Sequence, residues 1–133
     1  MKVYLSGPIY TADTPEARKA TDGWRDKARQ ILHWDIVIDP CRKKAIYDPK
    51  LFTPNEIVFR DLKDVEDADL LLVNINLIGD KLPIGTTMEI MYAWKLQKPV
   101  VLVSTDPRII NHPWLIAMSV RIFSDLKEAC NYI

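Results

Sequence analysis

The sequence predicts an α/β fold: a doubly wound parallel sheet with helices on both faces. Short runs of β-branched and other apolar residues alternate along the chain with longer segments of helical periodicity, the pattern of strand–helix–strand units. The most apolar run, residues 69–75, is typical of a central strand that is covered on both faces. The chain has 133 residues, and neither a repeat nor a linker divides it. We therefore expect a single domain over residues 1–133.

Five short apolar runs are the expected strands of this sheet. Turn-forming pairs close the first two runs, with Gly7-Pro8 after the first and Asp39-Pro40 after the second. The expected strands cover residues 2–6, 35–38, 69–75, 99–104 and 120–123. Residues 41–52 are polar and irregular, and a loop of that length at a strand end is often part of a site.

The first helix is expected between about residues 14 and 32. Its apolar positions recur every three or four residues and predict one buried face, formed by Ala17, Ala20, Trp24, Ala28 and Ile31. Such a face would pack directly against the sheet.

The start of the second helix is marked by Thr53-Pro54-Asn55-Glu56, a capping box with proline at the first helical position. We expect this helix to run to about Asp67. Further helices are expected at residues 86–97 and 125–133, with a loop or short helix around residues 112–118. Strands and helices thus alternate through the whole chain. In such sheets, ligands bind at the carboxyl ends of the strands.

Composition excludes several classes of function. Lys plus Arg is 18 and Asp plus Glu is 18, so the formal charge is zero and neither nucleic acid nor an anionic membrane is expected as the main partner. The two cysteines, Cys41 and Cys130, are too few for a disulfide framework and lack metal-ligand spacing. The apolar runs are too short to cross a bilayer, and the start lacks the core of a signal peptide. We expect a soluble cytoplasmic protein.

Asp61 is the first candidate for chemistry. It shares a helical face with Val58, Leu62 and Val65, and no cation lies three or four positions away. A carboxylate in that setting needs a distant partner or a shifted pKa. The alternative is a slightly rotated helix that leaves Asp61 at the solvated edge of the apolar face.

Glu89 is the second candidate, in a helix that is otherwise almost wholly apolar over residues 86–94. Thr86-x-x-Glu89 has the form of a capping box, which alone would account for an acid there. Near a helix N-terminus the dipole also favours the ionised form, as a nucleophile requires. Capping does not explain the apolar surroundings, which suggest a subunit interface.

Two carboxylates at the edge of one sheet suit glycosidic chemistry, in which one attacks the anomeric carbon and the other manages the proton. The hydroxyl of Tyr4, on the first strand, could orient a carboxylate, although a tyrosine on a central strand is more often only part of the core. From the residues alone, the sequence predicts an α/β domain with a candidate two-carboxylate site.

Seven segments, in order along nearly the whole chain, carry a more specific indication. They are Val3-Tyr4-Leu5-Ser6-Gly7-Pro8-Ile9, Trp24-Arg25, Asp39-Pro40, Arg60-Asp61-Leu62, Asp69-Leu70-Leu71-Leu72-Val73-Asn74, Gly85-Thr86-Thr87-Met88-Glu89-Ile90-Met91-Tyr92-Ala93-Trp94 and Lys98-Pro99-Val100-Val101. Together they resemble the nucleoside 2-deoxyribosyltransferases and the related nucleotide N-glycosidases. The segment from Gly85 to Glu89 is the most specific of them.

The resemblance implies a flavodoxin-like sheet of five parallel strands and a homo-oligomer whose active sites are completed by neighbouring subunits. It implies that Glu89 is the nucleophile that holds a covalent glycosyl intermediate, that Asp61 is the acid/base, and that Tyr4 hydrogen-bonds the nucleophile. The substrate would be a small nucleoside with its nucleobase, and no metal or organic cofactor is expected.

The same resemblance implies a set of substrate-binding residues. They are Ser6, Gly7, Pro8, Ile9 and Tyr10 after the first strand, Asp39, Asn74, Gly85 and Met118. Gly85 should let substrate approach the helix start closely, and Met118 lies in the segment that a neighbouring subunit is expected to contribute. Arg25 could reach a phosphate or pair with an acid, and we favour pairing.

The chain departs from the family pattern at two places. Pro83 stands six residues before Glu89, where transferases often have an acid and the nucleotide hydrolases a serine. Leu115-Ile116-Ala117-Met118 offers no serine where the hydrolases bind phosphate. These differences favour free nucleosides over 5′-monophosphates. Two alternatives remain beside the transferase: a hydrolase of the same architecture, and a non-catalytic module that senses nucleotides.

Overall fold

Five parallel strands form one sheet in the order β2-β1-β3-β4-β5. The computed structural model describes residues 1–10, 14–42, 51–77, 79–81 and 83–133. The strands are β1 (Lys2–Ser6), β2 (Ile36–Ile38), β3 (Leu70–Asn74), β4 (Val100–Val103) and β5 (Arg121–Phe123). This order and direction confirm the predicted doubly wound, flavodoxin-like fold. Its switch point lies between β1 and β3, where ligands bind in such sheets.

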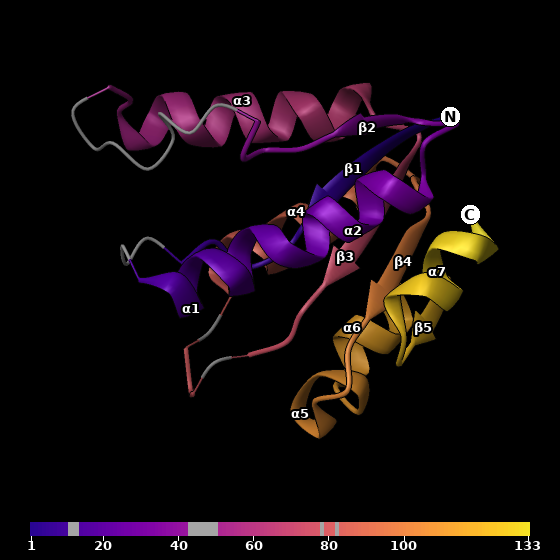
Figure 1. Cartoon of the computed structure of the whole chain (residues 1–133). Coiled ribbons are helices and arrows are strands. Elements are labelled where there is room, and N and C mark those ends of the chain that lie inside the picture. Colours follow the sequence, from indigo (N-terminus) through magenta and orange to yellow (C-terminus); the bar gives the residue numbers. More distant parts are fainter. Residues whose placement is uncertain (11–13, 43–50, 78, 82) are drawn as a thin grey trace.

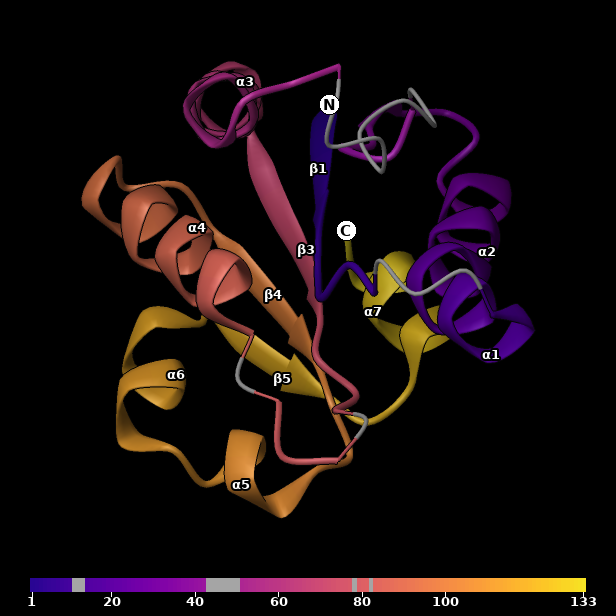
Figure 2. The same cartoon turned by 90° about the vertical axis from the view of Figure 1, so that its left-hand side faces the viewer.

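Helices cover both faces of the sheet, as predicted (Figures 1 and 2). One face carries the long N-terminal helical segment and α7 (Leu126–Tyr132); the other carries α3 (Pro54–Asp67), α4 (Ile84–Lys95) and α6 (Pro113–Met118). The short helix α5 (Pro107–Ile110) follows β4 and leads into α6. Of the predicted loop at residues 41–52, residues 43–50 lie outside the described part of the chain.

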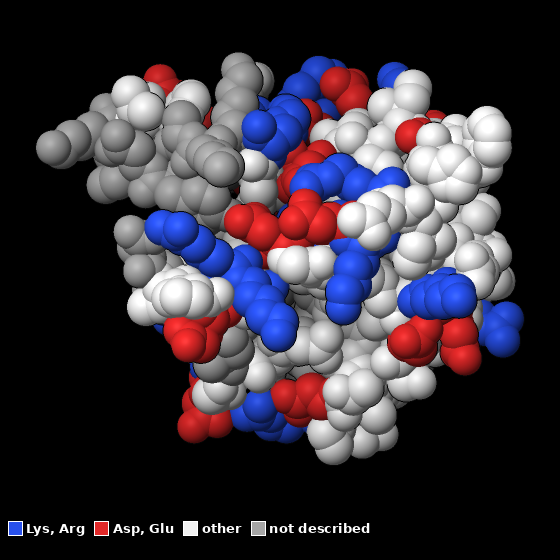
Figure 3. Space-filling view, in the orientation of Figure 1, with Lys and Arg blue, Asp and Glu red and all other residues white. Residues whose placement is uncertain are grey.

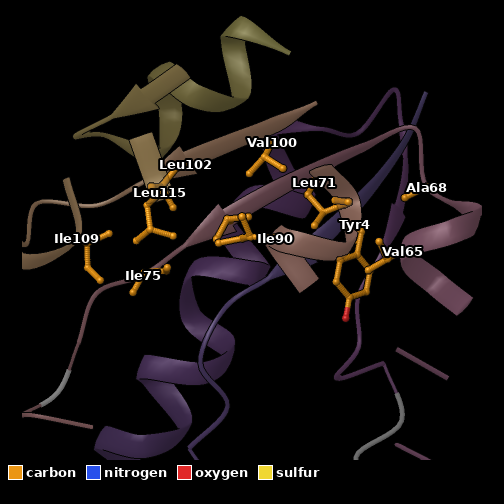
Figure 4. Close-up of a cluster of buried hydrophobic side chains, with 12 residues drawn as sticks. Tyr4, Val65, Ala68, Leu71, Ile75, Ile90, Val100, Leu102, Ile109 and Leu115 are labelled. Carbon is orange, nitrogen blue, oxygen red and sulfur yellow. The ribbon is translucent and has the colours of Figure 1, made fainter. Parts of the chain in front are cut away.

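The three interior strands, β1, β3 and β4, are buried on both faces, because each face of the sheet packs against its own layer of helices. On β1, Tyr4 belongs to the core beneath α3 and α4, whereas Val3 and Leu5 belong to the core beneath α7 and the N-terminal helical segment. This alternation follows from the two-residue period of a strand. Figure 4 shows the Tyr4 ring beside Val65, with its hydroxyl oxygen pointing away from the other labelled side chains. The Tyr4 ring thus packs within the apolar core, while its hydroxyl lies at the boundary of that core.

The first helical segment is interrupted. It consists of α1 (Pro15–Arg18), the π-helical stretch η1 (Lys19–Gly23) and α2 (Trp24–Ile31). The prediction of one regular helix with Ala20 and Trp24 on its buried face was therefore wrong in register: Thr21 and Arg25 are fully buried, and Ala20 and Trp24 only partly. The wider π turn rotates the following residues around the helix axis, and this brings the polar pair inward.

Two predicted helix starts had different outcomes. The capping box of α3 is confirmed, because Glu56 N donates to Thr53 Oγ1 (3.3 Å) and Thr53 N donates to Glu56 Oε2 (2.8 Å). The capping box at Thr86 and Glu89 is wrong. Helix α4 begins two residues earlier than predicted, with Pro83 at the N-cap, so Thr86 lies inside the first turn and Glu89 is the sixth helical residue.

No helix in the described residues is long and apolar enough to span a membrane.

Candidate active site

The carboxylate of Glu89 is held by two hydroxyl groups from the central strand β1. Tyr4 and Ser6 stand two residues apart and therefore project from the same face of the strand. The Tyr4 hydroxyl donates to Glu89 Oε1 at 2.8 Å, and the Ser6 hydroxyl donates to Oε2. Both donors are fully buried, whereas Glu89 is half-buried. The two hydrogen bonds fix the position and rotation of the carboxylate at the carboxyl end of the sheet.

Burial raises the pKa of Glu89 to about 7, from an ordinary value of 4.5. The hydrogen bonds from Ser6 and Tyr4 oppose this shift because they stabilise the anion, while the negative charge of Asp61 adds to it. The same surroundings raise the pKa of the Tyr4 hydroxyl well above 10.0, first through burial and then through the charge of Glu89. Tyr4 is therefore a hydrogen-bond donor at any physiological pH, and Glu89 ionises near neutrality.

Asp61, on α3, has a partner that its helical neighbours did not reveal. Arg60 donates to Asp61 Oδ1 from Nε at 3.1 Å and from Nη2 at 2.8 Å. The prediction that Asp61 lacks a local cation was wrong, because the long Arg60 side chain folds back onto the adjacent residue rather than across a helical turn. Burial still raises the pKa of Asp61 above 3.8, although the Arg60 hydrogen bond and charge lower it.

Both carboxylates face one cavity of about 290 Å³. Its walls come from the loop after β1, the end of β2, helix α3, and the loop and first turns of α4. The lining residues are residues 7–10, Pro40, Asp61, Lys81, residues 83–86 and Glu89. Of the sequence-predicted binding residues, the cavity therefore includes Gly7, Pro8, Ile9, Tyr10 and Gly85, while Ser6 lies behind Glu89.

The two glycines of the cavity have different surroundings. A Cβ atom on Gly7 would lie 2.7 Å from the carbonyl oxygen of Asn74 and 2.9 Å from the Trp24 ring, so only glycine fits between them. A Cβ atom on Gly85 would meet nothing within 4 Å. Gly85 therefore keeps the α4 backbone open to the cavity without any packing demand of the fold.

Asp39 does not line this cavity. The structure places its carboxylate inside the protein between two arginines of α2, in an ion pair with Arg25 (Oδ1 to Nε, 3.6 Å) and in another with Arg29. Cys41 N also donates to Asp39 Oδ1 at 2.8 Å. This ion pair with Asp39 confirms the prediction that Arg25 pairs with an acid.

Two further predicted binding residues lie elsewhere. Asn74, at the end of β3, lines a neighbouring cavity that shares Pro8 and Tyr10 with the first. Met118, the last residue of α6, lines a different cavity together with Trp94 of α4 and is not among the lining residues of the Glu89 cavity. Its predicted contact with substrate thus depends on a neighbouring subunit.

Five residues that line the cavity were not among the predicted site residues: Pro40, Lys81, Pro83, Ile84 and Thr86. The available signal was positional: Pro40 directly follows a strand, and Lys81 lies in the loop between a central strand and the next helix. Both places are at the carboxyl edge of the sheet, where ligands bind in this architecture. Among the described residues there is no cluster of three or more His, Cys, Asp or Glu side chains that could hold a metal ion.

The arrangement can supply a nucleophile and a proton carrier to one ligand. A carboxylate fixed at both oxygens suits attack on an electrophilic carbon, and a second carboxyl group with a raised pKa suits proton transfer to a leaving group. These are the two roles that cleavage of a glycosidic bond requires.

Comparison with known proteins also points to enzymes that act on N-glycosidic bonds. A family model described as nucleoside 2-deoxyribosyltransferase matches residues 3–127. The structure of the 2-deoxyribosyltransferase from the psychrotolerant bacterium Bacillus psychrosaccharolyticus aligns over 100% of this chain and 93% of that one, with 25% identity and a TM-score of 0.73. No curated protein sequence matches the chain.

Two more distant structures share the fold. A conserved protein from Enterococcus faecalis V583 aligns over 98% of this chain and 94% of that one, with 20% identity and a TM-score of 0.74. The CMP N-glycosidase from Clostridium botulinum aligns over 99% and 97%, with 16% identity and a TM-score of 0.63. Because the family model covers almost the whole chain, this protein belongs to the nucleoside 2-deoxyribosyltransferase family.

Proposed function

We propose that this protein transfers 2-deoxyribose between nucleobases, cleaving the N-glycosidic bond of a deoxynucleoside through a covalent ester on Glu89. The observation that carries the proposal is the double hydrogen bond from Tyr4 and Ser6 to Glu89, beside a cavity that also contains Asp61. Membership of the family supports the class of reaction, because its members act on N-glycosidic bonds.

In the first half-reaction, a Glu89 oxygen attacks C1′ of the sugar. The C1′–N bond breaks, its electron pair leaves with the base, and Asp61 donates the proton that neutralises the departing base. In the second, a ring nitrogen of the incoming base attacks C1′, the ester C–O bond breaks, and Asp61 takes back a proton. The two steps balance without any other reactant.

The surroundings of each group suit its role. Tyr4 and Ser6 keep the carboxylate oriented in both half-reactions. In the second half-reaction they also make it a better leaving group, because their hydrogen bonds stabilise the anion. Burial helps Asp61 to hold a proton, while Arg60 keeps its side chain fixed and prevents the pKa from rising further. One residue pair thus supplies attack and proton transfer from two helices.

We propose a free deoxynucleoside as the substrate rather than a 5′-monophosphate. Among the described residues, the cavity wall contains two carboxyl groups, Asp61 and Glu89, and one cation, Lys81. A phosphate dianion would add repulsion to this site, and Pro83 supplies no hydroxyl or N–H group to bind it.

We also propose that the active form is a homo-oligomer whose sites are shared between subunits. The outward face of α4 is apolar and exposed at Ile84, Met88, Met91 and Trp94. A second copy covering this face would reach the helix that carries Glu89, and its own α6 segment could then bring Met118 to the substrate. Sedimentation velocity should give a species larger than one chain, and a single 15.4 kDa species would contradict the proposal.

The reaction is tested by chromatography of the purified protein with a deoxynucleoside, with and without a second free base. The transferase predicts a new deoxynucleoside only when the second base is present. Equal release of free base in both reactions would instead identify a hydrolase, and deoxynucleotides should then be assayed. Binding without turnover of either substrate class would indicate a sensing module.

A further inference from the structure

Arg25 is a fully buried arginine directly beneath the cavity wall, and the proposed reaction assigns it no part. Its side chain is 0% exposed. Nη2 donates to the carbonyl oxygen of Gly7 at 2.9 Å, and Nη1 donates to the carbonyl oxygen of Thr21. Nε lies 3.6 Å from Asp39 Oδ1. A buried guanidinium with that many fixed partners is pre-organised rather than free to move.

The π-helical stretch η1 explains why an arginine is available at this place. The wider turn brings Thr21 and Arg25 to the buried side, and Arg25 uses its own side chain to satisfy the Thr21 carbonyl one turn before it. π turns of this kind are frequent at functional sites. The π turn therefore places the positive charge of Arg25 on the side of the helix that faces the sheet.

Thr21 and Arg25 hold opposite ends of the same cavity wall, residues 7–10. Arg25 binds the Gly7 carbonyl at one end, and Thr21 Oγ1 accepts a hydrogen bond from Tyr10 N (2.9 Å) at the other. The Trp24 ring packs against Gly7 between them and also stacks on the Arg25 guanidinium at 4.6 Å. The position of the wall is thus set from inside by consecutive turns of one helical segment.

The charge of Arg25 also acts on the proposed nucleophile. Its positive charge lowers the pKa of Glu89, against the larger raising effect of burial. On the surface above, acidic and basic side chains are interleaved over α1 and α2 (Figure 3). Arg25 differs from them because its side chain is fully buried. Asp39 partly balances that charge, with Arg29 on its outer side.

The other groups that face Glu89 come from three elements. They are the hydroxyls of Tyr4 and Ser6 on β1, Asp61 with its partner Arg60 on α3, and Lys81 in the loop before α4. The residues of β3, β4 and α6 that pack beneath α4 are apolar: Leu71, Val73, Val100, Leu102 and Leu115.

We propose that Arg25 is a positioning residue for the glycosyl-transfer reaction: it anchors the Gly7 end of the cavity wall, whose other end Thr21 anchors, and places a fixed positive charge behind Glu89. This inference rests on the proposed function for its effect on catalysis. The geometry itself, and the effect on Glu89, do not require turnover to be measured.

Four variants separate the anchor from the charge. Arg25→Gln removes the charge and most of the anchor, whereas Arg25→Lys keeps the charge but cannot bind the Gly7 and Thr21 carbonyls and Asp39 in the same planar fork. Thr21→Val removes the hydroxyl that accepts from Tyr10 N (2.9 Å) and donates to the Tyr10 carbonyl oxygen (3.5 Å), and leaves the charge of Arg25 in place. Arg121→Gln, on the edge strand β5, is the matched control for loss of one positive charge. Thermal unfolding identifies the variants that remain folded.

The first readout needs no substrate. A ¹³C NMR titration follows the Glu89 carboxyl, whose signal is assigned with the Glu89→Gln variant. The pKa of Glu89 should rise by roughly 0.5–1 pH unit in Arg25→Gln and stay unchanged in Arg25→Lys and Arg121→Gln. Hydrogen exchange of the Gly7, Ile9 and Tyr10 amides should accelerate in Thr21→Val and Arg25→Lys. An unchanged Glu89 titration in folded Arg25→Gln, or unchanged exchange in the other two, would overturn the proposal.

The second readout uses the substrate found in the activity assay. Arg25→Gln should lose about 3–9-fold in kcat/KM at pH 6 and less than about 2-fold at pH 8, which follows from the expected rise of the Glu89 pKa from about 7. Thr21→Val and Arg25→Lys should raise KM while the pH profile keeps its position; unchanged KM in both would overturn the anchoring role. If wild-type protein turns over no deoxynucleoside, the proposed function fails, while the titration and exchange experiments still decide the role of Arg25.

Discussion

The hydroxyl oxygen of Tyr4 lies 2.8 Å from Oε1 of Glu89, so the central strand of the sheet holds the carboxylate of the helix that covers it. The two residues are 85 positions apart, and each lies among side chains of the apolar core beneath α3 and α4. The buried Glu89 carboxylate costs stability in its charged form, even with the hydrogen bonds from Tyr4 and Ser6. The predictions below test whether it is used for catalysis.

Tyr4→Phe should lower kcat by about 10–100-fold, because a hydrogen bond to a charged group contributes about 1.5–3 kcal/mol. It should also raise the pKa of Glu89, since the Tyr4 hydrogen bond favours the anion. Steady-state kinetics over a pH series measures both effects. Tyr132→Phe, an exposed tyrosine on α7, is the control, and equal activity of the two variants would contradict the role given to Tyr4.

Asp61→Asn should lower kcat most for substrates whose departing base is most basic, because such a base depends most on a proton from the enzyme. Less basic leaving bases should lose less. The measurement is a series of deoxynucleosides with graded leaving-group basicity. Asp67→Asn, at the exposed end of the same helix, is the control. A uniform loss across the series would show that Asp61 does not supply the proton.

Activity should depend on pH through the ionisation of Glu89. A nucleophile must be deprotonated, so kcat/KM should fall as the pH is lowered through about 7, the pKa to which burial raises this carboxyl. The loss should approach tenfold per pH unit well below that value. A profile that is flat between pH 5 and pH 8 would contradict the assignment of Glu89 as the attacking group.

The same pKa makes Glu89 a cost to stability at high pH. A carboxyl whose pKa is 4.5 unfolded and about 7 folded binds its proton more tightly in the folded state, so its contribution is complete below pH 4.5 and is lost as the pH rises through 7. Glu89→Gln should therefore raise the free energy of unfolding by about 1–3 kcal/mol at pH 8 and by much less at pH 5. Denaturant titrations at the two pH values test this, with Glu128→Gln as the exposed control.

Gly7→Ala should destabilise the fold by about 1–3 kcal/mol and weaken substrate binding, because the added Cβ would overlap the Asn74 carbonyl and the Trp24 ring and displace the cavity wall. Gly23→Ala is the contrast, since its Cβ would lie at an ordinary 3.6 Å from the Lys19 side chain. That variant should stabilise the helix by about 0.5–1 kcal/mol. A Gly7→Ala variant as stable as Gly23→Ala would contradict the close packing at the wall.

Much of the fold could be predicted because its signals are local. The alternation of strand runs with helical periods places every strand within two residues of its observed bounds, and the cap at Thr53 marks the start of α3 correctly. The start of α4 could not be found in the same way. Thr86 and Glu89 have the spacing of a cap, but the backbone already becomes helical after Pro83.

The side-chain partners were harder to predict, because they depend on where helices sit rather than on spacing. Arg60 pairs with its immediate neighbour Asp61, a contact that rules based on helical turns leave out. Arg25 is buried only because a π turn changes the register of the helix before it. Arg25 pairs with Asp39, and the Asp39 carboxylate therefore does not line the cavity, although the family resemblance predicts that it binds substrate there.

The most direct test of the account is a search for the covalent intermediate. The protein is mixed with a deoxynucleoside in the absence of an acceptor base, quenched in acid and analysed by mass spectrometry of the intact chain and its peptides. The account predicts a mass increase of one 2-deoxyribosyl group on the peptide containing Glu89, which is absent from Glu89→Gln and disappears from wild-type protein when an acceptor base is added before the quench. Full transferase activity in Glu89→Ala, or a label on another residue, would contradict it.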